Sequence, residues 1–278
     1  MNPVTRPFRW SCVLTLFALL VGPLCTFATA DDEFDNARWK LQANVWISFP
    51  TGYFNGPNNE GYFDLQRDFG FGNHATFNGK LDWRFKRKHH LLFSTTPVVA
   101  SQTTILARTI DWQGQTFDIG ARADSRVASL IFSPGYQYDF FRKPQGSLGF
   151  QVVLNLAYTD ARLKLAGTSS GGGGGSASAD GSLFAPLPAV GPTFRWYPIA
   201  DSDRLYLDGS LTGMSFFGYG NFVSANAILG FPIAKKWDLH VGYLLGSRLR
   251  INSSDSDIAI RLTQKGPVFG VEHHWGTR

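Results

Sequence analysis

Residues 126–165, RVASLIFSPGYQYDFFRKPQGSLGFQVVLNLAYTDARLKL, decide the fold, because apolar and polar side chains alternate along two long runs within them. The apolar faces consist of Leu130, Phe132, Pro134, Tyr136, Tyr138 and Phe140 in the first run and of Leu148, Phe150, Val152, Leu154, Leu156 and Tyr158 in the second. A period of two predicts strands, and the turn 141–146 joins them as a hairpin. Both runs exceed the usual strand of about five or six residues and reach the roughly nine to eleven needed to cross a bilayer. The hairpin therefore predicts the repeat unit of a transmembrane β-barrel.

The alternation changes beyond Tyr158. There the apolar residues become Ala161, Leu163 and Leu165, which lie on the other face of the same run. A change of parity predicts either a β-bulge or the point at which the strand leaves the lipid, and the sequence leaves both readings open.

The alternation is sharpest in residues 77–86, where a mostly apolar face that includes Trp83 opposes a charged face of Lys80, Asp82 and Arg84. A Lys or Arg side chain that points into lipid at the middle of a bilayer costs roughly 2–4 kcal/mol. We therefore expect the charged face to point into the barrel. Three charges buried together must pair with one another or meet water.

Residues 1–30 are expected to be a signal peptide that is not part of the fold. A positively charged start precedes the apolar segment 12–24, and small residues before the first acidic pair predict cleavage after Ala30. A membrane-anchoring helix is less favoured, because the apolar segment is shorter than the 18 or so residues that a span requires. The remaining residues, 31–278, are long enough for one barrel domain.

Composition narrows the function classes. Both cysteines, Cys12 and Cys25, lie in the expected signal, so the rest of the chain predicts no disulfide and no cysteine metal site. Removing the signal takes two of the 26 Lys and Arg and none of the 21 Asp and Glu, and the resulting charge of +3 is too mild to indicate a nucleic-acid partner. No motif predicts a cofactor or a metal, since even the adjacent His273 and His274 would face opposite sides of a strand.

The whole chain predicts about ten antiparallel strands in up-and-down order, with eight to twelve possible. Long and short connections alternate, as in barrels with short periplasmic turns and longer external loops. Long loops are expected at 50–73, 98–125 and 168–182. The second contains a predicted hairpin at 111–117, and the third contains five consecutive glycines at 171–175, which favour a flexible loop.

Aromatic residues gather near the expected periplasmic ends of the strands. The residues assigned to this membrane interface are Trp83, Tyr138, Trp196, Trp237 and Trp275. Tyr and Trp side chains are enriched where lipid meets water, so the sequence predicts an aromatic girdle at this level.

A resemblance follows from these features. Phe63-Asp64-Leu65, Asp68-Phe69-Gly70-Phe71, Trp83-Arg84-Phe85 and the motif at 136–140, with a last strand ending near Trp275, resemble uncharacterised members of the bacterial outer-membrane β-barrel proteins. The resemblance implies an outer-membrane location, contact with outer-membrane lipids and lipopolysaccharide, and recognition by the barrel-assembly machinery. One departure is that three residues follow Trp275, whereas such proteins often end in an aromatic residue.

The expected interior is charged. The residues predicted to face the lumen as a charge network are Lys80, Asp82, Arg84, Asp139, Arg195, Asp208, Asp238, His240, Arg248 and Glu272. In barrels of eight to ten strands the side chains largely fill the lumen, so paired charges with a structural role are expected first. A narrow polar conduit is the alternative.

Three functions follow from this interior and these loops. We expect a structural or interaction protein that displays its external loops; the second reading is a narrow channel or transporter for small or hydrophobic solutes. An outer-membrane hydrolase is the third reading, because some barrels of this group are proteases with catalytic Asp and His residues at the outer rim. Its best candidate is His74, with Asp64 and Asp68 nearby, but no nucleophile at a matching spacing supports it.

Overall fold

A computed structural model of the chain describes residues 37–55, 62–68, 70–112, 115–168, 174–199, 205–216, 220–252 and 259–277. The expected signal peptide and its cleavage at Ala30 lie outside these residues. Within the described part of the chain, no helix is long and apolar enough to cross a membrane.

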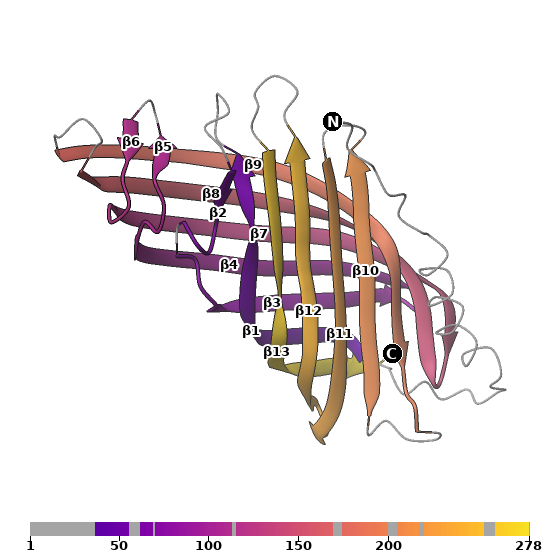
Figure 1. Cartoon of the computed structure of the whole chain (residues 1–278). Coiled ribbons are helices and arrows are strands. Elements are labelled where there is room, and N and C mark those ends of the chain that lie inside the picture. Colours follow the sequence, from indigo (N-terminus) through magenta and orange to yellow (C-terminus); the bar gives the residue numbers. More distant parts are fainter. Residues whose placement is uncertain are drawn as a thin grey trace.

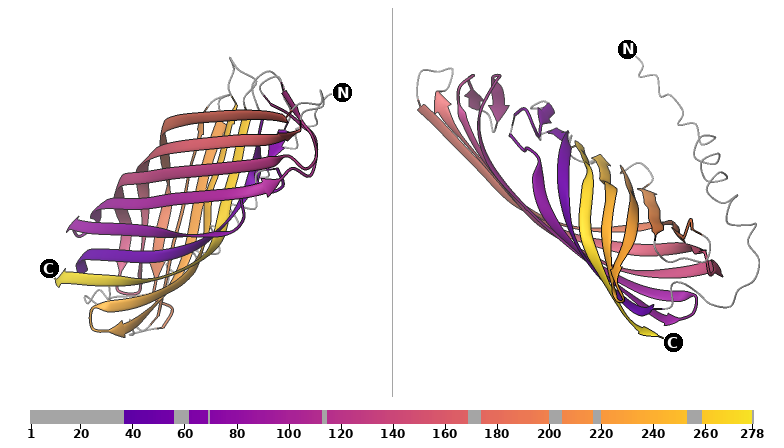
Figure 2. Two further views of the ribbon diagram at one scale, coloured as in Figure 1. Left: turned by 90° about the vertical axis from the view of Figure 1, so that its left-hand side faces the viewer. Right: turned by 90° about the horizontal axis from the view of Figure 1, so that it is seen from below.

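Ten long strands form a closed antiparallel barrel, which confirms the predicted fold class (Figure 1). They are β1 (Ala37–Asn55), β3 (His74–Lys86), β4 (His89–Ile105), β7 (Arg122–Lys143), β8 (Gly146–Thr168), β9 (Gly174–Trp196), β10 (Tyr206–Phe216), β11 (Gly220–Ala234), β12 (Trp237–Asn252) and β13 (Ala259–Thr277). Each pairs with the next along the chain, and β13 pairs with β1 to close the ring. Figure 2 shows the two walls of this barrel crossing at a steep angle.

The two ends of the barrel differ. Two-residue turns join β3 to β4, β7 to β8 and β11 to β12 at one end, where β1 also begins and β13 ends; we call it the turn end. The opposite end is the loop end. There β4, β7, β8 and β9 continue past the other strands as an extended wall (Figure 1).

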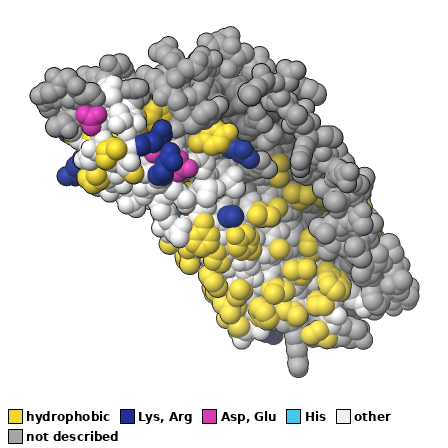
Figure 3. Space-filling model, in the orientation of Figure 1, with side chains coloured by type: hydrophobic (Ala, Val, Ile, Leu, Met, Phe, Trp, Pro, Cys, Tyr) yellow, Lys and Arg dark blue, Asp and Glu magenta, His cyan; other side chains and the backbone are white. Residues whose placement is uncertain are grey.

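Between the two ends the outer face of the barrel is apolar and the inner face polar. Leu130 and Phe150 are 50% and 45% exposed on the outside, whereas the inward Ser133 and Gln151 are buried. Figure 3 shows hydrophobic side chains spread over the lower part of the visible surface, with charged groups gathered near the loop end. This is the sidedness of a barrel surrounded by lipid.

A small folded unit lies against the inner face of the extended wall. It comprises β2 (Tyr62–Asp64), the turn after it, and the hairpin of β5 (Ile110–Trp112) and β6 (Gln115–Phe117). We call the described residues of 62–73 and 106–121 the cap. Its hydrophobic core contains Phe63, Leu65, Phe71, Leu106, Ile110, Phe117 and Ala121 from the cap and Ala123, Leu163 and Leu165 from the wall.

The cap explains the parity change beyond Tyr158. The β8–β9 pairing has no register shift, and the single shift between β7 and β8 lies near the turn end, so there is no bulge at this point. The strand leaves the lipid instead. Leu163 and Leu165 face inward by the unchanged parity of β8, and the cap covers these apolar side chains.

All three predicted loops are shorter than expected. In the first, residues 50–55 belong to β1, and 50–54 pair with β13. The glycine-rich third loop was wrong from Gly174 onward, because β9 begins there and pairs with β8 up to Thr168. Backbone hydrogen bonds to a neighbouring strand need no side chain, so glycines can extend the ladder. In the second loop, residues 98–105 belong to β4 and 122–125 to β7, which pair with each other in the extended wall.

Candidate functional site

The lumen near the turn end holds a first buried cluster, formed by Asp82, His90, Asp139 and Arg142, which we call the His90 cluster. His90 Nδ1 lies 2.8 Å from Asp82 Oδ1, and its Nε2 lies 3.2 Å from Asp139 Oδ2. Arg142 Nη1 donates to Asp139 Oδ2 at 2.8 Å. Since carboxylate oxygens accept hydrogen bonds, the imidazole is a donor on both sides and joins two strands that are not neighbours in the sequence.

Two members of this cluster were missed from the sequence. Arg142 was assigned to the turn, but a register shift between Asp139 and Phe141 reverses the parity of β7 and turns Arg142 inward. His90 is the second residue of β4, and polar and apolar residues do not alternate in its sequence His89-His90-Leu91-Leu92-Phe93, so its inward position was not evident. His90 lies two residues before the buried Leu92, so the two side chains share the inner face of β4. That spacing is the signal that could have revealed it.

A second buried cluster, the Tyr206 cluster, contains Arg195, Tyr206, Asp208, Asp238, His240 and Glu272. Arg195 donates to Asp208 Oδ2 at 2.7 Å and lies 3.5 Å from Glu272 Oε2. Its guanidinium carbon also stands 4.4 Å from the centre of the Tyr206 ring. Tyr206 donates its hydroxyl to Asp238 at 2.9 Å, and the same oxygen lies 2.8 Å from His240 Nε2.

Tyr206 is the centre of this cluster and was not predicted, although it shares the parity of Asp208. Space for its ring comes from Gly230, the residue directly opposite on β11. A Cβ atom at Gly230 would lie 2.1 Å from the Tyr206 ring, so a side chain there would displace the ring. An inward glycine opposite an inward aromatic residue is the sequence signal for this packing.

The clusters leave little free space in the turn-end half of the lumen. A cavity of about 30 Å³ lies between them, and Lys40, Lys80, Asp82 and Asp208 are among its lining residues. This volume has room for about one or two water molecules. Farther toward the loop end, Trp46 packs with Ile228 and Val268 inside the barrel.

The remaining charged residues divide into two cases. Arg84 is buried, opposite His90 across β3 and β4. Arg248 lies in β12 eight residues beyond His240, toward the loop end, and its place in the predicted charge network stays a prediction. The side chain of Arg248 lies outside the described part.

The outer face of the turn end carries a connected row of aromatic rings. Trp39 stacks on Trp83 at 5.1 Å and lies 6.2 Å from Trp275, so the rings cross the seam between β1 and β13. The ring contacts continue through Trp237, His273, Trp275, Trp39, Trp83, Phe85, His89 and Tyr138. The His273 ring lies between Trp237 and Trp275 and continues the row. Trp196 ends β9 at the same end.

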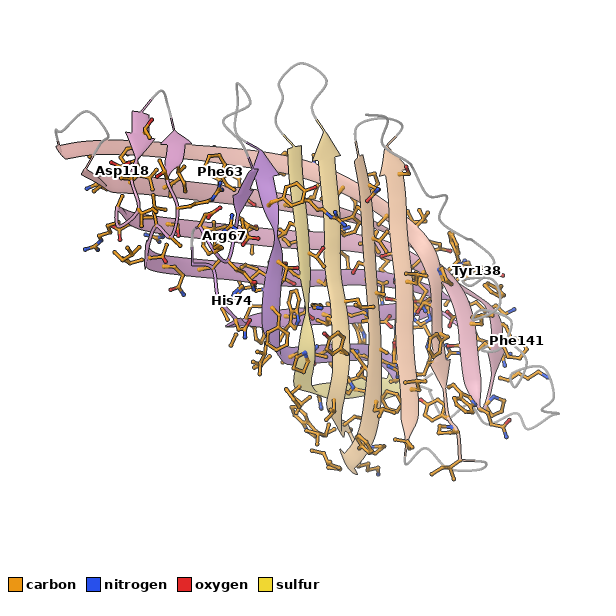
Figure 4. The ribbon with its side chains drawn as sticks, viewed as in Figure 1. Phe63, Arg67, His74, Asp118, Tyr138 and Phe141 are labelled. Carbon is orange, nitrogen blue, oxygen red and sulfur yellow. The ribbon has the colours of Figure 1, made fainter. Side chains whose placement is uncertain are left out.

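At the loop end the cap is fixed by one buried carboxylate. Asp68 is fully buried and accepts hydrogen bonds from Arg108 at 3.1 and 2.7 Å, from Arg67 at 3.2 Å and from the backbone of Asp64 at 2.8 Å. Burial raises the pKa of Asp68, but these hydrogen bonds and the Arg108 charge outweigh it and hold the pKa below its ordinary value. Figure 4 shows Phe63 and Arg67 at this end and Tyr138 at the other.

The residues considered for hydrolysis are not arranged as a catalytic group. His74 Nδ1 lies 3.3 Å from the carbonyl oxygen of Gly72, and its Nε2 is buried with no hydrogen-bond partner among the described residues. Asp64 accepts backbone N–H groups in its own turn, and Asp68 binds Arg108. Neither carboxylate orients the imidazole.

No protein-family model and no curated protein sequence matches the chain. Among solved structures it is similar to the outer membrane protease OmpT from Escherichia coli, with a TM-score of 0.56 and 12% identity over 89% of this chain and 99% of that one. The Pseudomonas putida toluene transporter TodX (TM-score 0.37, 8% identity, 86% and 91% coverage) and Ail of Yersinia pestis (0.31, 9%, 84% and 97%) are too dissimilar to support an inference. At such identities the likeness concerns the fold. With its closed ring, apolar outer band and aromatic girdle, the chain has the fold of a bacterial outer-membrane β-barrel protein.

Proposed function

We propose that this protein is a non-conducting outer-membrane barrel that acts as an interaction protein through its external end. The observation that carries the proposal is the contrast between the ends. Side chains fill the turn-end lumen down to a cavity of about 30 Å³, whereas the loop end carries a cap with its own hydrophobic core. In outer-membrane barrels the short turns face the periplasm, so the cap faces outward.

A folded cap suits recognition better than an unstructured loop. Its core fixes the turn around Asp68 and the β5–β6 hairpin against the wall, so a partner meets a surface that is already ordered. Binding to an ordered surface avoids the entropy cost of fixing a loop at the moment of association. The proposal assigns no catalytic role to the chain.

Single-channel recording in a planar bilayer tests the closed lumen. The refolded protein is expected to insert without stepwise conductance, because among the described residues the side chains of the two clusters surround a cavity of only about 30 Å³. Reproducible conductance steps whose ion selectivity changes in Asp208→Asn would replace the proposal with the narrow channel. Heat-modifiable migration on gels serves as the folding control for both proteins.

Binding by the cap is tested with cells that display the protein over arrays of immobilised glycans and extracellular proteins. Phe117→Ala, in the cap core, is expected to abolish any binding that wild-type cells show and empty-vector cells lack. The matched control Phe184→Ala removes the same atoms from a side chain that is 60% exposed on β9. Equal binding by wild type and Phe117→Ala, or no binding above empty vector, contradicts the proposal.

A further inference from the structure

The turn-end mouth of the lumen contains three side chains placed as a set of metal ligands. Asp238 on β12 and Glu272 and His274 on β13 each offer one donor atom, and the three atoms lie within 4.8 Å of one another. Asp238 and Glu272 are directly opposite in the strand register, and His274 follows Glu272 on the same face. The strands thus bring two carboxylates and an imidazole to one point.

Two buried carboxylates facing each other need a compensating positive charge. Glu272 is 1% exposed, lies 3.5 Å from Arg195 and accepts a hydrogen bond from Gln42 at 2.7 Å. Asp238 is 4% exposed, and its only ion-pair partner among the described residues is His274, at 3.8 Å. Like charges opposed across strands are destabilising, and a buried carboxylate without a cation is costly.

An independent observation also favours a bound cation at this point. Asp238 Oδ2 accepts the Tyr206 hydroxyl, but its Oδ1 is buried and has no hydrogen-bond partner in the described part of the chain. Buried polar atoms are almost always satisfied, so an unpaired oxygen in such a cluster marks a place for a bound group. Lys40, opposite His274 on β1, is buried and lines the lumen cavity beside these ligands.

From this geometry we propose that Asp238, Glu272 and His274 bind one divalent transition-metal ion, with Zn²⁺ as the best match. Carboxylate oxygens and imidazole nitrogens are Zn²⁺ ligands with bonds of about 2.0–2.2 Å, which place tetrahedral donors about 3.3 Å apart. The donor atoms now lie up to 4.8 Å apart, so the side chains must close by up to about 1.5 Å. Three protein ligands leave a fourth position open to water, and Tyr206, His240 and Gln42 orient the ligands from behind.

The site opens toward the periplasmic side, since the His274 side chain is 28% exposed there. An ion can therefore enter without crossing the lumen. The inference does not rest on the function proposed for the cap, because the two features lie at opposite ends of the barrel.

The test is titration of the chelator-treated protein in detergent micelles with Co²⁺, whose visible absorption reports the ligand set, followed by Zn²⁺ competition. One ion per chain is expected for the wild type. His274→Ala and Asp238→Asn should weaken binding at least tenfold. His273→Ala is the matched control, because the neighbouring His273 faces outward in the aromatic row and should leave binding unchanged.

Asp238→Asn also distinguishes a metal ion from the alternative that Asp238 is simply protonated. Asn keeps the acceptor for the Tyr206 hydroxyl and nearly the same shape, so this variant should fold even if His274→Ala does not. If Zn²⁺ raises the melting temperature of the wild type and not that of Asp238→Asn, the site is supported. Absence of a Co²⁺ spectrum in folded wild type, or equal loss in His273→Ala and His274→Ala, overturns it.

Discussion

The lumen and the cap share two strands, β7 and β8, whose inner faces are polar in the lumen and apolar under the cap. In the membrane, β7 and β8 point Leu130 and Tyr158 outward and bury Asp139 inside. Beyond the lipid the same strands point Arg162 outward and bury Leu165 under the cap. One continuous strand can therefore lie partly in lipid and partly in water, because the residues facing lipid must be apolar whereas those facing water need not be.

The largest loss of free energy of unfolding is expected from Arg195→Met, which removes a positive charge from the lumen. The change leaves Asp208 and Glu272 buried without their shared guanidinium. Removing one partner of a buried ion pair costs about 3–5 kcal/mol. Urea unfolding of the barrel in micelles measures this loss of free energy of unfolding.

The control is Arg122→Met, in which a guanidinium that is 59% exposed leaves Asp124 on the outer wall. An exposed pair contributes at most about 1 kcal/mol. Comparable losses in the two variants would mean that the lumen charges are not compensated by pairing.

The next effect concerns the cap alone. Phe117→Ala removes a fully buried ring from the cap core and should cost about 3 kcal/mol of local stability, near the low end for Phe because a surface unit can partly collapse. Limited proteolysis should then cut within 106–121 while the barrel keeps its heat-modifiable migration. Protection equal to that of Phe184→Ala would show that the cap core does not hold the hairpin.

A smaller effect is expected from Gly230→Ala, which fills the space taken by the Tyr206 ring. Overpacking of this kind costs about 1–3 kcal/mol and should also disrupt the hydrogen bonds to Asp238 and His240. Gly72→Ala is the control, since a Cβ there has no neighbour closer than 4.0 Å. Urea midpoints that shift equally in both would contradict the close packing.

The smallest effect is a pH dependence of the cap. The folded pKa of Asp68 is lowered from its ordinary 3.8, so this carboxylate stabilises the cap above that pH and the contribution is lost as the pH falls through the folded pKa. The protection factors of the cap amides, which correct for the pH dependence of intrinsic exchange, should therefore fall in acid below pH 3.8. Asp68→Asn should lose about 1–2 kcal/mol at neutral pH and show a flatter profile.

The sequence alone predicted the barrel because lipid imposes a period of two that the residues must obey. It also predicted the hairpin at 111–117, which the β5–β6 pairing confirms. It did not predict that this hairpin packs into a cap, since Phe63, Leu106 and Phe117 come from separate segments and meet only through tertiary packing. The same limit applies to β9, where backbone pairing with β8 orders the glycines at 174 and 175.

For the lumen, parity located most of the charged residues but not their partners. It failed at Arg142, where a register shift reverses inside and outside, and at Tyr206, whose aromatic ring does not suggest a charged network. Which residues pair depends on strand register around a closed ring, and no local pattern fixes that register.

The aromatic row has a consequence for the order of assembly. Trp39 and Trp275 come from opposite ends of the chain and meet only where β1 joins β13. Until β13 pairs with β1, each of these strands has one unpaired backbone edge. Each unsatisfied backbone group costs several kcal/mol in lipid. Ring closure is thus the most non-local pairing in the molecule, and such pairings are slow because chain entropy must be lost before they form. The tryptophans at the seam give that final step apolar area to bury.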